Sequence, residues 1–269
     1  MNSKNVPDRP LYVAGWGHAT FAATLVVLGI VGLITGDFTA IWTPVPAHVP
    51  AREVLAYFSG LVALGTGAAL FWRRGAAVAS GVLLGVLLAW LLVLDVPDLV
   101  LNPGMAAIWP ACKTATLVAA AGVLYVRFVG GDAEGRQAFA GRRIGLRITR
   151  ALYGLALIPF GIAHFTYLTR TVSMVPGWLP WHLAWAYFFG CTFIAAGIAV
   201  LIRVYARLAA VLVVVQLAMF TVLVWVPVVS SHPRASDWTE FVTSWALTAA
   251  AWVIADSYRD IPWLAVGAG

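Results

Sequence analysis

Long stretches without a charged side chain are the feature that most constrains this chain. Segments 11–34 and 206–229, LYVAGWGHATFAATLVVLGIVGLI and ARLAAVLVVVQLAMFTVLVWVPVV, contain a single Lys, Arg, Asp or Glu between them, Arg207. About 20 apolar residues suffice to cross a hydrocarbon core of about 30 Å. Only 10% of all residues are charged, against about 25% in soluble domains. The sequence therefore predicts an all-α, polytopic integral membrane protein.

The first apolar segment follows Lys4 and Arg9, as the apolar core of a secretory signal would. It is longer than the roughly 7–15 residues of such a core, and no clear small-residue cleavage site follows it. We therefore expect segment 11–34 to be the first spanning helix rather than a cleaved leader.

The chain carries an internal repeat. Without gaps, segment 46–103 matches segment 176–233 at 15 of 58 positions, and AYFSG in the first corresponds to AYFFG in the second. The prolines are the stronger signal, because the four prolines of each window coincide: Pro46, Pro50, Pro97 and Pro103 with Pro176, Pro180, Pro227 and Pro233. The sequence predicts a tandem duplication.

Each unit is expected to contain four helices. The domains predicted are a first, divergent repeat over 1–130, an Arg-rich cytoplasmic linker over 131–146, and a second repeat over 147–269. An even number of spans returns the chain to its starting side, so the two units share one orientation and are related by an axis along the membrane normal. The expected spans, with Pro97 and Pro227 ending the third helix of each unit, are 11–35, 53–72, 76–96, 105–127, 147–168, 183–202, 206–228 and 239–257.

Arginines set the expected orientation. The chain has a net charge of +6, but its arginines gather in three loops that alternate with loops nearly free of Lys and Arg. This is the positive-inside pattern. It favours contact with anionic lipid head groups over nucleic acid. We expect a protein integral to the plasma (inner) membrane, with both termini cytoplasmic. The arginines concerned are Arg73, Arg74, Arg127, Arg136, Arg142, Arg143, Arg147, Arg150, Arg203 and Arg207.

Segment 154–202 carries a recognisable string. It contains Phe160, Gly161, His164 and Phe165 as FG..HF, then MVPGWLP over 174–180, and then two helix glycines, Gly190 and Gly197. This string resembles the DoxX-like family of four-helix bacterial membrane proteins. The likeness covers most of the second unit and reaches the first unit mainly through the internal repeat.

The resemblance implies a redox-associated membrane component. Members of the family include subunits linked to thiosulfate:quinone oxidoreduction and proteins placed near oxidative-stress systems. A quinone is then the candidate cofactor, and other membrane redox proteins are the candidate partners. Many relatives carry an acidic residue three positions after the second-helix glycine. This chain has Phe193 and, in the first unit, Ala63 at those positions, so it lacks that carboxylate.

Lys113 and Asp95 are candidate site residues because ionisable groups at membrane depth are costly. Lys113 lies about eight residues, or roughly 12 Å, into its expected helix. Its repeat counterpart is Thr243, and that of Asp95 is Trp225, so both charges belong to one unit only. One interpretation is a Lys113–Asp95 contact inside the bundle. The other is that the lysine extends its amine to the outer interface and does nothing more.

His164 is the other main candidate, near the outer end of its helix. Histidine can shuttle protons near neutral pH and can hydrogen-bond a quinone carbonyl, but an interfacial histidine that only meets water has the same sequence pattern. Arg170, His182, Arg52 and Glu53 lie on the same outer side. They either complete a polar mouth or are ordinary loop residues.

Motifs for other chemistry are missing from the sequence. The five histidines show no HxxxH or HxxE spacing, so we expect no metal site. There is no GxGxxG or GxxxxGK[ST] motif, and no residue stands out as catalytic. Cys112 and Cys191 do not form a CxxC pair. They are either two unreactive buried thiols or a bridge formed in an oxidising compartment.

Three functions remain open at this stage. The first is a quinone-interacting redox component with an outer-leaflet pocket lined by His164, Lys113 and Asp95. The second is non-enzymatic binding or transport of a small apolar molecule or lipid between the two units, because parallel repeats often place a site at their interface. The third is a scaffold for other membrane proteins.

Overall fold

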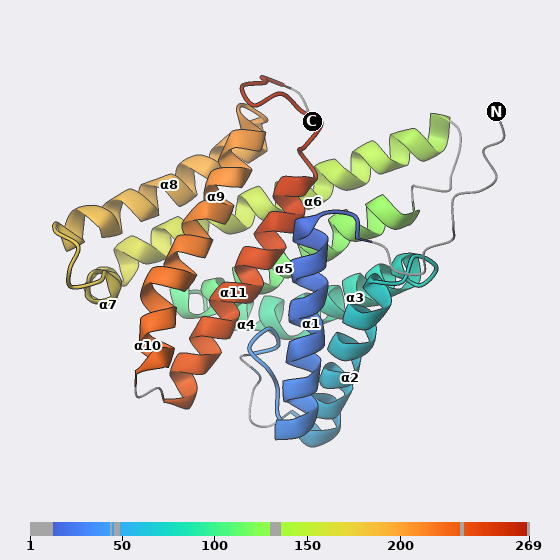
Figure 1. Ribbon diagram of the computed structural model, residues 1–269, viewed down its shortest axis with the longest axis horizontal. Coiled ribbons are helices and arrows are strands. Elements are labelled where there is room, and N and C mark those ends of the chain that lie inside the picture. The colour runs from blue at the N-terminus through green and yellow to red at the C-terminus, as the bar shows by residue number, and fades with distance from the viewer. Residues whose placement is uncertain (1–12, 44, 46–48, 130–135, 232–233, 268–269) are drawn as a thin grey trace.

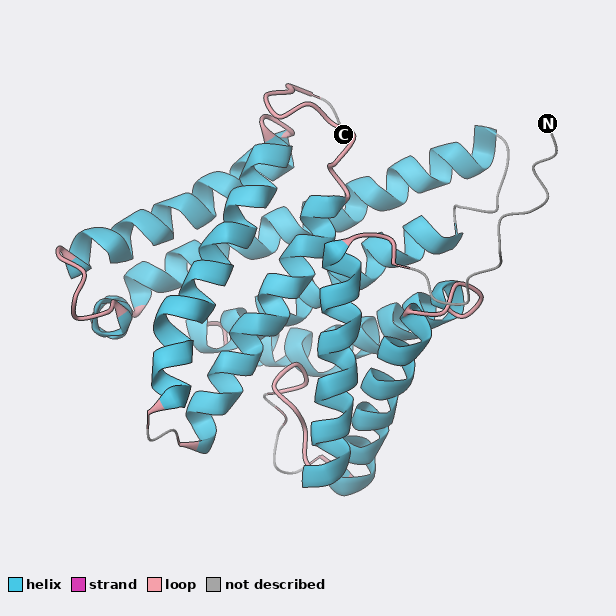
Figure 2. Cartoon of the chain, viewed as in Figure 1, coloured by secondary structure: helices cyan, strands magenta, loops and turns pink. Residues whose placement is uncertain are grey.

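The computed structural model describes residues 13–43, 45, 49–129, 136–231 and 234–267. Every regular element among them is helical (Figure 2). The elements are α1 (Trp16–Thr35), α2 (Arg52–Leu70), α3 (Ala76–Trp90), the π-helix η1 (Leu91–Asp95), α4 (Val96–Leu101), α5 (Met105–Val129), α6 (Arg136–Thr166), α7 (Leu168–Met174), α8 (His182–Ile202), α9 (Ala206–Phe220), the π-helix η2 (Thr221–Trp225), α10 (Val226–Ser230) and α11 (Ala235–Asp256).

Seven helical segments of the described chain are long and apolar enough to cross a membrane. This agrees with a polytopic membrane protein. The eighth predicted span coincides with α11, which is 22 residues long but carries Asp237 and Glu240 near its start and is not among the seven. The seven segments are Trp16–Thr35, Arg52–Leu70, Ala76–Leu101, Met105–Val129, Ala140–Thr166, His182–Ile202 and Ala206–Ser230.

Two expected boundaries are wrong. Pro97 and Pro227 do not end their helices, since α4 and α10 continue to Leu101 and Ser230. A π-helical turn precedes each proline, and Val96 N–H donates to the carbonyl of Leu91 five residues back. This wider turn carries the helix up to a residue that has no N–H to donate. The expected linker 131–146 is also helical from Arg136 onward, because α6 begins there.

Eight of the described helices form a closed ring, and two of them on opposite sides of the ring, α5 and α11, contact each other through its middle. In chain order α1, α2, α3, α5, α6, α8, α9 and α11 each contact the next, α11 returns to α1, and α5 also contacts α11. Figure 1 shows α1, α11 and α9 side by side, with α5 and α6 passing behind them. The described chain has no β-sheet, so these helices pack directly against one another.

Small residues let the central helices approach. Ala119, Ala120 and Ala121 of α5 are fully buried, and so are Ala249, Ala250 and Ala251 of α11. Large apolar side chains point outward instead: Ile34 is 79% exposed and Leu101 77%. Helix contacts made by small residues, with large aliphatic side chains on the outside, are typical of membrane proteins. In lipid the helices associate through close packing rather than through the exclusion of water.

Arginines mark one end of the bundle, which we call the arginine end. There Arg127 Nη2 donates to the carbonyl of Ala14 at 2.6 Å, and Gly17 N–H donates to Asp256 at 3.2 Å. The start of α1 and the ends of α5 and α11 therefore meet. The α1–α2 loop, α7 and the start of α11 lie at the other end, which we call the opposite end.

Candidate functional site

An apolar cavity of about 90 Å³ lies between helices of the second half, α6, α8, α9, η2 and α11, and helix α5 of the first half. Its α6 wall consists of Tyr153, Leu157, Phe160 and His164. These residues recur at steps of three and four, so they share one face of the helix. At 1.5 Å per residue the face extends about 16 Å. The cavity is therefore elongated, with His164 toward the opposite end and Tyr153 toward the arginine end.

Aromatic rings form most of the wall near His164. The rings of Trp109 and Phe160 meet edge to face with centroids 4.7 Å apart. Phe193 of α8 lies 5.4 Å from the His164 ring and 6.1 Å from Phe160. Such pairs hold each other in fixed orientations. Phe193 occupies the position at which the family resemblance implies an acidic residue, and here it is part of an apolar wall.

Tyr153 has a hydroxyl group without a partner. The side chain is completely buried, and its oxygen makes no hydrogen bond within the described chain. A buried polar group left unpaired costs about 1–3 kcal/mol. Such unpaired groups are rare in native proteins. Where they occur, a water or a ligand often completes the hydrogen bond. Tyr153 was not predicted as a site residue, although it stands eleven residues before His164 on the same helix face.

His164, which lines the cavity, is bound to its own helix through one ring nitrogen. Its Nδ1 lies 2.8 Å from the carbonyl oxygen of Phe160 and must carry the proton to donate to it. In the neutral ring that proton assignment leaves Nε2 as an acceptor. The two polar groups therefore differ, since Tyr153 can donate as well as accept, whereas His164 Nε2 accepts.

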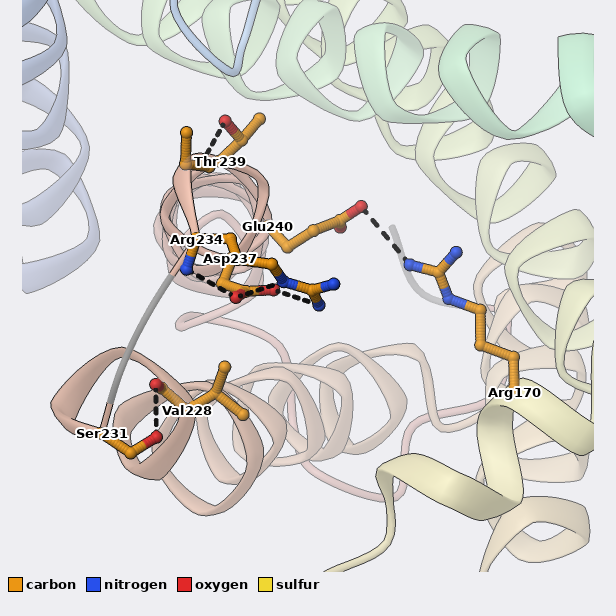
Figure 3. Close-up of polar contacts among 8 residues, drawn as sticks. Arg170, Val228, Ser231, Arg234, Asp237, Thr239 and Glu240 are labelled. Carbon is orange, nitrogen blue, oxygen red and sulfur yellow. Dashed lines mark hydrogen bonds and ion pairs between the residues drawn. The ribbon is translucent and has the colours of Figure 1, made fainter.

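Other polar groups line the cavity with partners of their own, among them Gln216 and Glu240. Gln216 Oε1 accepts from Thr192 at 2.7 Å, and its Nε2 donates to the carbonyl of Phe189 at 3.2 Å. Glu240 forms an ion pair with Arg170 of α7 at 3.8 Å, and Figure 3 shows the two side chains pointing toward one another from separate helices. The pair links α7 to α11 near the opposite end. Its exposure makes its energetic contribution small, about 0–1 kcal/mol.

Two other hollows share walls with this cavity. One, of about 160 Å³, lies under α7 and the MVPGWLP segment and shares His164, Phe189 and Phe220 with the cavity. The other is an apolar groove of about 400 Å³ between α8 and α9, which shares Phe189 and Gln216. Both hollows are lined almost entirely by apolar side chains, so a hydrocarbon chain could occupy either.

Lys113 and Asp95 do not line the cavity, and the expected pocket shared with His164 is wrong for the described residues. Lys113 Nζ donates to the carbonyl of Ala40 at 2.9 Å and to that of Thr43. The ion pairs of the described chain do not join Lys113 to Asp95, and Asp95 Oδ2 is buried without a hydrogen bond. The lysine therefore holds the loop after α1. It forms no ion pair with Asp95, although the two charges attract each other electrostatically.

The remaining candidates are dispersed. Arg170 reaches Glu240, while His182 begins α8 and Glu53 is exposed in the first turn of α2. None of these three lines the cavity itself. Arg52 pairs with Asp37 at 3.2 Å. No polar mouth made of all four residues exists in the part of the chain that the structure describes.

The two cysteines are not both buried, since Cys112 is partly buried and Cys191 is exposed. Cys112 and Cys191 are both free thiols, so no bridge joins them. Among the described residues no three His, Cys, Asp or Glu side chains gather closely enough to hold a metal ion.

Comparison with known proteins returned no relative: no family model, no curated protein and no solved structure matches this chain.

Proposed function

We propose that this integral membrane protein binds a small, largely apolar molecule with hydrogen-bonding groups at its ends or ring edge. The ligand occupies the cavity between α5, α6, α8, α9 and α11. A quinone is the ligand that fits best, because its ring carbonyls accept hydrogen bonds and its body is apolar. The protein is then a redox-associated, DoxX-like component of the plasma (inner) membrane.

The Tyr153 hydroxyl is the observation that supports this proposal. It is buried in an apolar wall, has no protein partner among the described residues, and needs an acceptor or a water to offset its desolvation. A quinone oxygen supplies such an acceptor. At the other end of the cavity His164 Nε2 accepts a hydrogen bond, which suits the hydroxyl of a reduced quinol. The site can therefore hold both forms of the ligand.

Size favours a single ring in the cavity. Pockets for drug-sized ligands typically span about 300–1,000 Å³, and this cavity of about 90 Å³ is smaller. An apolar protein cavity of about 150 Å³ accepts benzene. Both reference volumes exceed that of the cavity, so a ring-sized head group must extend into a neighbouring hollow that shares its walls.

We further infer that the bundle is a tandem duplication of two parallel four-helix units with eight spans. Five elements begin at Arg52, Ala76, Leu91, Val96 and Met105, and five others begin at the equivalent positions of the ungapped repeat, His182, Ala206, Thr221, Val226 and Ala235. Ala51 and Trp181, which are equivalent in the same register, both precede their helices with positive φ. This correspondence and the shared contact order support the repeat. The arginine end and both termini then face the cytoplasm.

An alternative is non-enzymatic binding or transport of a lipid or other apolar molecule. Two observations favour it. The acidic residue expected of a redox site is replaced by Phe193, and the cavity adjoins an apolar groove open along α8 and α9. A protein that only moves its ligand needs the passage and the recognition groups, but no proton acceptor of matched acidity.

The test is a titration with a short-chain quinone, followed by fluorescence of Trp109 and Trp225, which line the cavity. Saturable quenching is expected for the native protein. Tyr153→Phe should weaken the affinity about fivefold, because it removes one hydrogen bond worth roughly 1 kcal/mol. The matched control is Tyr187→Phe, an exposed tyrosine on α8 outside the cavity, which should bind like the native protein.

Two results would separate the alternatives. Non-saturating quenching that is equal in all three proteins would mean partitioning into detergent and would overturn the quinone proposal. Repeating the titration with a fatty alcohol tests the transport function. Binding of the alcohol at equal strength, with the same sensitivity to Tyr153→Phe, would favour a general apolar carrier.

A further inference from the structure

A second pocket, of about 280 Å³, lies at the arginine end and is lined by arginines rather than aromatic rings. It is separate from the cavity described above and shares no residue with it. Arg147 and Arg150 reach it from α6, Arg203 from the end of α8, and Tyr258 from the turn after α11. Three arginines thus line one hollow.

No carboxylate from the described residues lines this pocket. Arginines that line a pocket without a carboxylate favour an anion there. Tyr258 supplies no negative charge. Its burial raises the pKa of the phenol to about 12, even though the neighbouring Arg150 acts in the other direction. The phenol therefore stays neutral near pH 7, and the pocket remains positive.

Arg150 is held in place with donors to spare. Its side chain is buried, Nε donates to Ser257 Oγ at 3.0 Å, and Nη2 donates to the Ser257 carbonyl. The guanidinium also stacks over the Tyr258 ring at 3.9 Å. A guanidinium has five N–H donors in a fixed fork, so about three remain after these two bonds. Such a pre-oriented fork is the arrangement that binds phosphate oxygens in pairs.

The backbone that carries Arg203 is fixed in an unusual conformation. Arg203 and Tyr205 both have positive φ, 58° and 53°, a region that costs non-glycine residues free energy. The C-terminal segment holds them there, because Gly267 N–H donates to the Arg203 carbonyl and Tyr205 N–H donates to the Ala265 carbonyl, both at 2.9 Å. The Arg203 side chain is exposed and makes no hydrogen bond or ion pair within the described chain.

We propose that this pocket binds a phosphate group, in which Arg150 supplies the fixed fork and Arg147 and Arg203 supply further charge. Val200 and Leu201 form its apolar side, which suits a phosphate attached to a hydrocarbon chain. Basic pockets between spanning helices at the cytoplasmic side bind anionic lipid head groups in this way. The phosphate comes either from an anionic phospholipid or from free phosphate, and the two sources share this chemistry.

The repeat supplies a matched control. Arg73 is the repeat counterpart of Arg203 and is also exposed. Equivalent helix contacts, Leu25 beside Gly67 and Leu157 beside Gly197, place Gly15 and His18 where the second half has Arg147 and Arg150. The first half therefore has one arginine where the second half has three. Arg203→Gln removes a charge from the pocket, whereas Arg73→Gln removes the same charge elsewhere at the same end.

The experiment measures thermal stabilisation of purified native protein, Arg203→Gln and Arg73→Gln in neutral detergent. Each protein is titrated with phosphatidylglycerol, with phosphatidylcholine and with inorganic phosphate. Phosphatidylglycerol should stabilise the native protein and Arg73→Gln at similar concentrations. Arg203→Gln should need about fivefold more, equivalent to the ~1 kcal/mol that each basic residue contributes near an anionic surface.

The arms also identify the source of the phosphate. Stabilisation by phosphatidylglycerol alone assigns a lipid head group, while equal stabilisation by inorganic phosphate assigns free phosphate. Either result supports the pocket, provided that Arg203→Gln weakens it selectively. Equal stabilisation by the zwitterionic phosphatidylcholine, or equal responses of Arg203→Gln and Arg73→Gln, would overturn the proposal.

Discussion

The two halves of the chain differ most at the place where the second half has its cavity. In the first half this place is filled by the loop after α1, whose Trp42 is buried and packs on Trp90 with ring centroids 5.0 Å apart. Lys113 ties the same loop down through the carbonyls of Ala40 and Thr43. The first half is closed by its own chain.

In the second half the corresponding positions are open. Phe220 and Thr243, the repeat counterparts of Trp90 and Lys113, line the cavity instead of contacting a buried loop. The segment that follows α6 forms α7, which packs on α6 and α8. One helical arrangement thus accommodates either a plug or a hollow, depending on which way a short loop folds. This difference is the basis for the proposal that the binding site lies in the second half.

The largest expected effect tests the closed half. Lys113→Met leaves the carbonyls of Ala40 and Thr43 without their charged donor, and hydrogen bonds to charged groups contribute about 1.5–3 kcal/mol each. We expect a loss of about 3 kcal/mol or more. At roughly 2–4 °C per kcal/mol, the melting temperature should fall by at least about 6 °C. Scanning fluorimetry of the variant beside Arg73→Met, an exposed control, measures this.

An unchanged melting temperature for Lys113→Met would mean that the lysine does not hold the loop. The closed state of the first half would then need another explanation, and the contrast between the halves would weaken accordingly.

A smaller effect tests the packing of the open half. A Cβ atom at Gly161 would overlap the carbonyl oxygen of Gly190 on α8, so Gly161→Ala should push α6 away from α8. Overpacking of this kind costs about 1–3 kcal/mol. Gly85→Ala is the control, because a Cβ there meets nothing within 4 Å and alanine favours the helix. Thermal melts should therefore show opposite signs for the two variants, and equal shifts would contradict the close approach.

The smallest effect concerns Tyr153. Because its hydroxyl is buried without a partner among the described residues, Tyr153→Phe should stabilise the ligand-free protein by about 1 kcal/mol, at the lower end of the cost of an unpaired group. The melting temperature should rise by a few degrees, whereas ligand binding weakens. A lower melting temperature would indicate that a water or other group already satisfies the hydroxyl in the empty protein.

Much of the helical framework follows from the sequence, since long apolar runs and coincident prolines locate most helices to within a few residues. The continuation of the helices beyond Pro97 and Pro227 could not be predicted from the sequence, because it depends on the π-helical turn that precedes each proline. The partners of Lys113 were also hidden, since they are backbone carbonyls of a loop far away in the sequence. The hydrophobic pattern of the sequence did not show where the loop after α1 lies, nor that it fills the interior of the first half.

The candidate site was predicted only in part. His164 was found because an ionisable group in an apolar helix stands out. Tyr153 was missed because tyrosine is common in membrane helices, and only its burial without a partner distinguishes it. Glu240 was missed because it lies near a helix start, where acidic residues are ordinary. Grouping Lys113 with His164 was wrong because similar depth in the membrane was taken as proximity, whereas the Lys113 amine extends to the loop after α1 and not into the cavity.

The most direct measurement fills the cavity with a longer side chain at the position equivalent to Lys113. Thr243 lines the cavity at the position where the first half has Lys113, so Thr243→Met introduces a side chain of similar length without the charge. Thr239→Met, one turn earlier on α11 and exposed, is the control. Short-chain quinone is titrated into both variants and followed by tryptophan fluorescence. We predict that saturable quenching is lost in Thr243→Met, with no fall in melting temperature, and kept in Thr239→Met. Native affinity in Thr243→Met would contradict the assignment of the cavity as the binding site.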